Sequence, residues 1–289
     1  MKSFSIFSVI LILTIAISSC TNKEEVSDMN ILYLHHSTGG VIWQGKKPSI
    51  ATRAIRKVSP DLADALGGQA VLPALFEKYN KVNGKNYQIR EMNFPKKAPY
   101  GWNNYPYDYY NIWVRNQGDQ PYMEEPTLEM LTRDHQVIIF KHCYPVSNIK
   151  PDQDSSDIDS DYKSLANYRL QYNALRDKLH EFPDTKFIVW TGAVQTRARL
   201  TEDEALRSKE FYDWVTAEWD IADDNIYLWD FYGLETEGGL YLKEEYATSP
   251  TNSHPNYTFA GKAAELLFNR IIDVIEKNGN NTTLTGEKK

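Results

Sequence analysis

A hydroxyl side chain with two neighbouring histidines follows a short apolar run near the start of the chain, in NILYLHHSTGG (residues 30–40). Thr38, Gly39 and Gly40 predict a turn that admits positive φ angles. Such a turn would hold Ser37 at the rim of a sheet beside free backbone N–H groups, as a nucleophile with an oxyanion hole requires. Ser37 is therefore a candidate nucleophile, and an ordinary turn is the alternative.

A base for that serine is offered near the other end of the chain, in TSPTNSHPNYTFAGKAAELL (residues 248–267). Serine is a poor nucleophile without a base in hydrogen-bonding reach. His254 lies in a Pro- and Asn-rich loop just before the last predicted helix. In a doubly wound sheet this loop opens at the same edge as the loop after the first strand, so we expect His254 and Ser37 to meet. A solvated or helix-capping histidine is the alternative.

The third predicted strand ends at the same rim in Lys141, His142 and Cys143. Lys141 is a candidate contact for an oxyanion or an anionic substrate, and a lysine whose ammonium reaches solvent from a strand end is the alternative. Cys143 is interpreted as a small buried hydrophobe rather than a nucleophile. We expect no metal site from His35, His36 and His142, because no carboxylate or second histidine has a recognisable metal-ligand spacing.

Three further side chains are candidate substrate contacts. Gln195 and Arg197 follow the fourth predicted strand, in WTGAVQTR, and are candidates by location alone. His36 is the third. His35 and His36 alternate across the strand end, so both cannot easily face the serine.

Five short apolar runs predict buried strands. They cover residues 30–34, 87–94, 136–143, 186–193 and 225–231. Three of them are almost continuously apolar, as in strands covered on both faces. Helical patterns occupy residues 70–82, 164–182, 202–219 and 258–277. This alternation predicts an α/β fold with a parallel sheet between helices.

One long insertion, residues 95–126, breaks the alternation. It is rich in Tyr, Trp and Pro, which makes it too polar for a core strand and too aromatic for a linker. Long ordered loops are usually functional, and this one emerges at the sheet edge where ligands of open α/β folds bind. A ligand-binding loop and a packed surface flap both remain open.

The first residues are typical of a secretory signal. Lys2 precedes a long apolar run that ends in small residues, which predicts a signal peptide over residues 1–19. The ISSC segment resembles the lipobox of bacterial lipoproteins, with Cys20 as the lipidated first residue of the mature chain. An ordinary signal peptide with an incidental cysteine is the alternative. The resemblance implies an exported protein held in the bilayer by its acylated amino terminus, at the outer membrane or cell surface, with a linker over residues 20–29.

Composition limits the partners and the number of domains. The net charge is −7 and no Lys/Arg block stands out, so nucleic acid is not an expected partner. With Cys20 assigned to lipid, Cys143 is the one cysteine left, which excludes a disulfide framework. The 19 Tyr and 7 Trp suit sugar rings, although they also fill cores. We expect one domain over residues 30–277 and a flexible tail over residues 278–289.

Together, the HHSTGG and SHPNYTFAGKAAELL segments resemble the SGNH (GDSL-like) hydrolase superfamily. Its nucleophilic serine follows the first strand, and its histidine precedes the carboxy-terminal helix. The resemblance extends over roughly residues 30–277 in element order and is specific at these two segments. It implies a flavodoxin-like, three-layer α/β/α sandwich with a five-stranded parallel sheet, and catalytic roles for Ser37 and His254. It also implies hydrolysis of esters, often acyl groups on carbohydrates or lipids.

The supporting residues depart from the family pattern. The family's Gly-Asp-Ser block is His-His-Ser here, and its acid, three residues before the histidine, is Thr251. His254 would then be oriented by a backbone carbonyl or a distant acid such as Asp230. FKHCYPVSNI stands in place of the family's Gly-x-Asn-Asp block, so Asn148 and Gly101 are the candidates for its oxyanion-hole donors.

The sequence thus predicts a lipid-anchored serine ester hydrolase that removes acyl groups from carbohydrate and needs no cofactor. One rival is a surface glycan-binding protein that keeps the hydrolase scaffold without catalysis, which the missing acid at Thr251 favours. A second rival is a structural or assembly lipoprotein with no small ligand.

Overall fold

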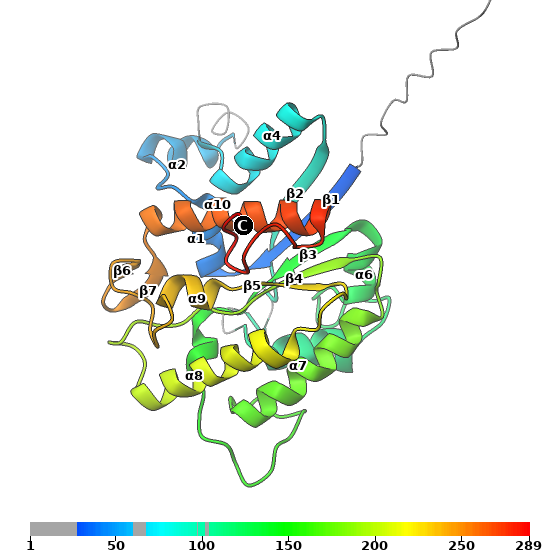
Figure 1. The fold of residues 1–289 in the computed structure, drawn as a ribbon, viewed down its shortest axis with the longest axis vertical. Coiled ribbons are helices and arrows are strands. Elements are labelled where there is room, and N and C mark those ends of the chain that lie inside the picture. The colour runs from blue at the N-terminus through cyan, green and yellow to red at the C-terminus, as the bar shows by residue number, and fades with distance from the viewer. Residues whose placement is uncertain (1–27, 60–67, 97, 102–103) are drawn as a thin grey trace, which may run out of the picture.

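The computed structural model describes residues 28–59, 68–96, 98–101 and 104–289 (Figure 1). The expected signal peptide and Cys20 lie outside these residues and stay predictions. In the described part of the chain, no helix has both the length and the apolar composition needed to cross a bilayer.

Five parallel strands form one sheet, and each corresponds to a strand that the sequence predicts. They are β1 (Asp28–His35), β2 (Asn86–Asn93), β3 (Val137–Phe140), β4 (Lys186–Trp190) and β5 (Ile226–Trp229). Their order across the sheet is β2-β1-β3-β4-β5. The strand order therefore reverses between β1 and β3, and open α/β sheets bind ligands beside such a switch point, at the carboxyl ends of the strands.

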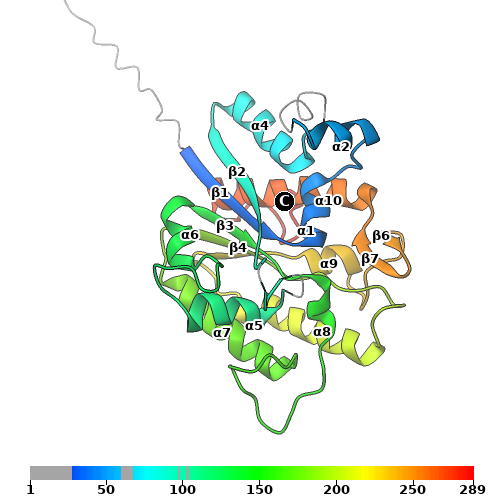
Figure 2. The ribbon, with the colours of Figure 1, turned by 180° about the vertical axis from the view of Figure 1, so that it is seen from behind.

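Helices cover both faces of this sheet (Figures 1 and 2). One face carries α1 (Ser37–Gln44), α4 (Val71–Asn83) and α10 (Tyr257–Lys277), and the other carries α6 (Leu128–Asp134), α7 (Leu165–His180) and α8 (Glu202–Trp214). Alternate residues of β1 divide between the two cores, so that Tyr33 packs in one and Leu34 in the other. The predicted α/β fold with a parallel sheet between helices is confirmed.

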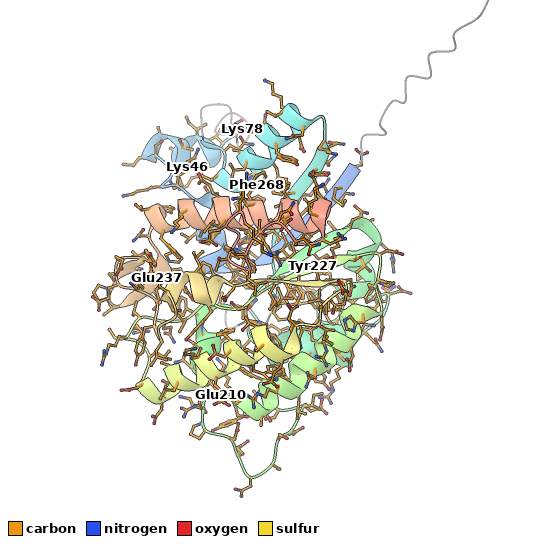
Figure 3. The ribbon with its side chains drawn as sticks, in the orientation of Figure 1. Lys46, Lys78, Glu210, Tyr227, Glu237 and Phe268 are labelled. Atoms are coloured by element: carbon orange, nitrogen blue, oxygen red, sulfur yellow. The ribbon has the colours of Figure 1, made fainter. Side chains whose placement is uncertain are left out.

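The remaining elements lie around these layers. They are α2 (Ile50–Arg56), the 3-10 helix η3 (Tyr144–Ser147), the π-helix η4 (Val215–Trp219), α9 (Phe231–Thr236) and the antiparallel pair β6 (Ala247–Ser249) and β7 (Asn252–Pro255). Side chains fill the space between the layers, whereas charged residues such as Lys78 and Glu210 stand on the outside (Figure 3).

The 95–126 insertion contributes to the core of the second face. It forms the short helix α5 (Pro106–Tyr109), which runs directly into the π-helix η2 (Tyr110–Arg115). Tyr109 and Trp113 are fully buried. The Trp113 ring stacks on Phe94 at a centroid distance of 5.0 Å and meets Phe140 edge-on at 5.3 Å. This part of the insertion is therefore a packed element, as one of the two open interpretations proposed.

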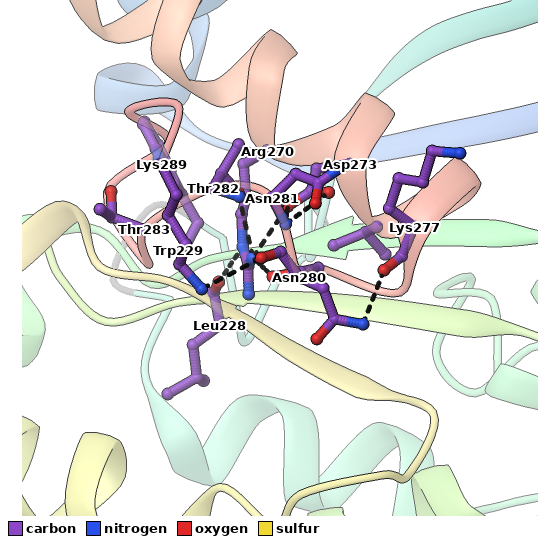
Figure 4. A network of polar contacts seen from close by, with 12 residues as sticks. Leu228, Trp229, Arg270, Asp273, Lys277, Asn280, Asn281, Thr282, Thr283 and Lys289 are labelled. Atoms are coloured by element: carbon purple, nitrogen blue, oxygen red, sulfur yellow. Dashed lines mark hydrogen bonds and ion pairs between the residues drawn. The ribbon is translucent and has the colours of Figure 1, made fainter.

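The last twelve residues fold back onto the domain, so the expected flexible tail is wrong (Figure 4). The carboxylate of Asp273 in α10 accepts hydrogen bonds from the backbone N–H groups of Asn281 and Thr282, at 3.0 and 2.7 Å, and from the Thr282 hydroxyl at 2.7 Å. The guanidinium of Arg270 donates to the Gly279 carbonyl at 2.9 Å. These bonds fasten the chain end beside β5, where the Trp229 indole N–H donates to a tail carbonyl at 3.0 Å.

Candidate active site

Ser37 lies at the carboxyl edge of the sheet as the first residue of α1. The preceding His36 is extended and forms the N-cap position. The Ser37 side chain is exposed, and its hydroxyl oxygen lies 3.8 Å from the thiol sulfur of Cys143, just past β3. The structure thus brings together the segments that follow β1 and β3, at the switch point of the sheet.

Gly39 and Gly40 are helical residues of α1, so the predicted positive-φ turn is wrong. A Cβ atom on Gly39 would lie 2.4 Å from the Cβ of His35 and 3.0 Å from the Cδ of Lys141. The glycine is required because the first turn of the helix packs directly on these two side chains. This close packing sets where Ser37 stands at the rim.

His36 ties the segment after β2 to the start of α1. Its ring is half-buried, and Nε2 is hydrogen-bonded to the carbonyl of Pro95. Burial lowers the pKa of His36, the bond to the Pro95 carbonyl opposes this, and the charges of Lys141 and His35 lower it further. Its predicted role as a substrate contact stays a prediction.

The other two histidines near the rim are buried and have separate partners. Nε2 of His35 lies 2.9 Å from the carboxylate of Glu91 on β2, and Nε2 of His142 lies 2.7 Å from the hydroxyl of Tyr172 on α7. Burial, followed by the nearby lysine charge, lowers the pKa of His142 to about 3. Across the described residues, no three His, Cys, Asp or Glu side chains are grouped as metal ligands.

Lys141 is completely buried, so the alternative of an ammonium group reaching solvent is wrong. Its Nζ donates to the Cys143 sulfur at 3.4 Å and lies 5.9 Å from the ring centre of Trp190. No carboxylate in the described part of the chain lies within ion-pair distance of it. Burial lowers the pKa of Lys141, while Cys143 and the buried carboxylate of Glu235 oppose that shift. In its protonated form, a lysine with so little compensation would give the rim a positive potential.

His254 lies in β7 with its ring half-buried, edge-on to the ring of Tyr144 at a centroid distance of 5.3 Å. Its Nδ1 lies 2.7 Å from the side-chain oxygen of Asn252, which also accepts the backbone N–H of His254 at 3.2 Å. Because an amide oxygen only accepts, Nδ1 carries the proton and Nε2 keeps its lone pair. Burial, and then the charge of Lys141, lowers the pKa of His254, so the imidazole is neutral at pH 7, as a base must be.

The short hairpin that carries His254 is held on the end of α10. The side chain of Asn256 caps this helix by accepting the backbone N–H of Phe259 at 3.0 Å, and its amide donates to the Glu245 carbonyl at 2.7 Å. β7 in turn packs against α1. These contacts explain why a residue so late in the chain stands beside the start of α1.

The predicted nucleophile and base therefore reach the same edge of the sheet, since Tyr144, which contacts His254, directly follows Cys143, which contacts Ser37. In Figures 1 and 2, α1, β6 and β7 lie toward the same end of the sheet. The hydrogen bonds of the described residues do not include one between Ser37 and His254. Direct proton transfer between them stays a prediction.

The orienting partner of His254 is one that the sequence interpretation missed. Asp230 caps α9 instead, where its carboxylate accepts the backbone N–H of Gly233 at 2.9 Å and the Thr191 hydroxyl at 2.6 Å. Asn252 holds the imidazole. It stands two residues before His254, and side chains two apart in a strand share a face, so this spacing was the available signal.

Among the described residues, none of the remaining candidates is hydrogen-bonded to Ser37. The side-chain oxygen of Asn148 accepts the amide N–H of Gln195 at 2.8 Å, which leaves the amide nitrogen of Asn148 as a donor. Gly101 has a φ of 92°, and no described atom outside its chain neighbours lies within 4 Å of where its Cβ would be. The exposed Arg197 guanidinium lies over an aromatic ring. Their roles as oxyanion donors or substrate contacts stay predictions.

Two further buried polar residues support the rim. No sequence pattern singles them out. The side-chain oxygen of Asn104, in the insertion, accepts the backbone N–H of Cys143 at 3.1 Å, and its amide donates to the Phe94 carbonyl at 2.7 Å. Glu235 accepts the backbone N–H of Val194 at 2.5 Å. Burial raises the pKa of Glu235 well above its usual range.

Comparison with protein-family models, with curated proteins and with solved structures finds no match to the chain.

Proposed function

We propose that the protein is a serine ester hydrolase of the SGNH type, which removes acyl groups from carbohydrate at the cell surface. The observation that carries the proposal is the placement of an exposed serine and a neutral, oriented histidine at one edge of the sheet. The strand order β2-β1-β3-β4-β5 supports it, because this is the order of flavodoxin-like sheets, whose ligands bind beside the first strand.

In the proposed reaction, the Ser37 hydroxyl attacks the ester carbonyl while Nε2 of His254 accepts its proton. The imidazolium then gives this proton to the leaving alcohol, and water releases the acyl group by the reverse sequence. Asn252 keeps the imidazole in the tautomer that presents Nε2. A neutral amide stabilises the imidazolium less than a carboxylate does, so we expect a slower enzyme than one with a full triad.

The oxyanion of the tetrahedral intermediate would lie at the amino terminus of α1. The backbone N–H of Ser37 and the positive end of the helix dipole are suited to it. The amide nitrogen of Asn148 and the N–H of Gly101 are the further donors that we propose. Buried Lys141 adds positive potential behind the same edge.

The carbohydrate assignment rests on the aromatic composition and on the proposed export with a lipid anchor at Cys20. Tyr and Trp rings offer flat apolar faces with polar edges, which suit sugar rings. A Cys20→Ala variant that still fractionates with membranes would contradict the anchor.

The test is turnover of a panel of p-nitrophenyl esters and acetylated oligosaccharides, with purified wild type and Ser37→Ala. We expect the variant to lose at least about a hundredfold in kcat, because both the nucleophile and its activated proton are gone. Ser155→Ala, at an exposed serine in the loop before α7, is the matched control. Activity that survives in Ser37→Ala defeats the serine mechanism.

A glycan-binding protein without catalysis is the second candidate, favoured by the lack of a hydrogen bond between Ser37 and His254 among the described residues. Retained binding of oligosaccharides by a wild type that hydrolyses no ester would support it.

A further inference from the structure

A chain of three polar atoms runs from the exposed rim into the core. The Ser37 hydroxyl oxygen lies 3.8 Å from the Cys143 sulfur, which lies 3.4 Å from Nζ of Lys141. The first group is exposed, and Cys143 and Lys141 are 1% and 0% exposed. The proposed nucleophile is thus connected to a buried lysine through one sulfur atom.

The chemistry of the three groups sets which atom donates and which atom accepts in each of these two contacts. An ammonium group has only donors, so the sulfur must accept from Lys141. A thiol has a single hydrogen, which is then left to point at the Ser37 oxygen. The serine hydrogen is correspondingly free to point away from Cys143.

We propose that Cys143 and Lys141 are positioning residues for Ser37: the ammonium orients the thiol, and the thiol donates its S–H to the serine oxygen. The inference rests on the proposed serine hydrolase. It assigns no proton transfer to the thiol or the amine. The S–H contact steers the serine hydrogen toward His254 and, with the lysine charge behind it, stabilises the alkoxide character that develops as His254 takes the proton.

In this proposal Lys141 is an ammonium group, and several groups face it. Cys143 follows it on the same strand end, Glu235 comes from α9, and the histidines whose pKa it affects are His36, His142 and His254. Glu235 is the one carboxyl group in this set; its ionised form would favour the protonated lysine, while burial raises the pKa of Glu235 itself. Burial lowers the pKa of Lys141 from 10.5, so activity should fall on the alkaline side below that value. A lysine acting as a neutral base would give the opposite trend, with activity rising as it deprotonates.

The direct test is the S–H stretching band of Cys143 in a Raman or infrared spectrum. The chain has two cysteines, so Cys20→Ala leaves a single thiol. We expect one band at the lowered frequency of a hydrogen-bond donor, moving to higher frequency in Cys20→Ala/Ser37→Ala and shifting in Cys20→Ala/Lys141→Met. Absence of any S–H band, which means a thiolate, overturns the assigned direction, as does a band unchanged by loss of Ser37.

Kinetics provide the second test. Cys143→Ala should lower kcat about tenfold, the rate equivalent of one hydrogen bond, with KM unchanged, and Cys143→Ser should restore most of the rate. Lys141→Arg should move the alkaline limb upward in pH, whereas Lys141→Met should abolish it. Wild-type kinetics in Cys143→Ala overturn the inference but leave the serine mechanism standing. If no ester is hydrolysed the proposed function fails, and the vibrational result still decides whether the S–H points at Ser37.

Discussion

Nδ1 of His254 and the side-chain oxygen of Asn252, two residues earlier in the same strand, lie 2.7 Å apart. This neutral amide takes the place that a carboxylate holds in a catalytic triad. The imidazole is therefore oriented but receives no negative charge.

Changing Asn252 should separate orientation from charge. We expect Asn252→Ala to lower kcat about tenfold or more, because the imidazole loses the bond that fixes its tautomer. Asn252→Asp should keep or raise kcat and raise the pKa of His254. Thr251→Ala, at the exposed neighbour, is the control and should have little effect. Equal kinetics of wild type and Asn252→Ala would show that the amide has no catalytic role.

In the pH profile of the proposed reaction, the acid limb of kcat/KM should lie at low pH. The base must be neutral, and burial and the charge of Lys141 lower the pKa of His254 from 6.5. We therefore expect kcat/KM to stay on its plateau to below pH 6.5 and to fall only at more acidic pH. In Lys141→Met the limb should move to higher pH. A limb centred above 6.5 in the wild type would argue against His254 as the base.

Gly39 and Gly40 form a matched pair for testing the packing of α1. A Cβ on Gly39 would lie 2.4 Å from that of His35, whereas the nearest atom to one on Gly40 is 3.3 Å away. Gly39→Ala should destabilise the fold by about 1–3 kcal/mol, as overpacking does. Gly40→Ala should be near neutral, because a small clash is offset by the better helix propensity of alanine, about 1 kcal/mol. Urea unfolding of both variants measures the difference, and equal midpoints would refute the packing argument.

His142 should make the domain sensitive to acid. An unfolded histidine binds a proton below about pH 6.5, whereas the folded His142 does so only below about 3, so between these values the unfolded state holds more protons. Stability should be complete above pH 6.5 and fall as the pH drops toward 3, by at most on the order of 5 kcal/mol. His142→Gln should flatten this slope in urea midpoints recorded from pH 3 to 8. An unchanged slope would remove His142 as the cause.

Asp273 should be a main attachment point of the chain end. It accepts three donors from Asn281 and Thr282. We expect Asp273→Ala to cost about 1–3 kcal/mol in the free energy of unfolding and to expose residues 278–289 to limited proteolysis. Glu265→Gln, at an exposed acid of the same helix, controls for charge. A tail equally resistant in Asp273→Ala would show that other contacts hold it.

The sheet was predictable because its strands are short apolar runs whose burial is a local property of the sequence. Ile31 to Leu34 are buried on both faces, and Val137 to Phe140 likewise, so composition alone indicates them. The insertion was harder to interpret. Its polar residues are typical of a loop, while Tyr109 and Trp113 pack in the core against Phe94, just after β2, and Phe140 on β3.

The details of the candidate site depend on contacts between distant segments. Gly39 is needed because of His35, four positions earlier, and of Lys141, about a hundred positions later, and no sequence pattern distinguishes that need from a turn. The surroundings of Lys141 likewise come from distant segments, since its Nζ lies 5.9 Å from the ring centre of Trp190 and Glu235 from α9 affects its pKa. The order of elements indicated which segments meet at the rim, whereas the hydrogen-bond partners had to come from the fold.

β1 separates the amino-terminal end of the described chain from Ser37. The described chain enters the sheet at Asp28 and leaves the strand at His35, seven residues later, a distance of about 23 Å at the usual rise per residue. Any tether pulling on the amino-terminal side would therefore hold the domain by the edge opposite Ser37. With the proposed lipid anchor, Ser37 would then face away from the membrane, toward soluble or neighbouring polymers rather than toward the lipids of that membrane.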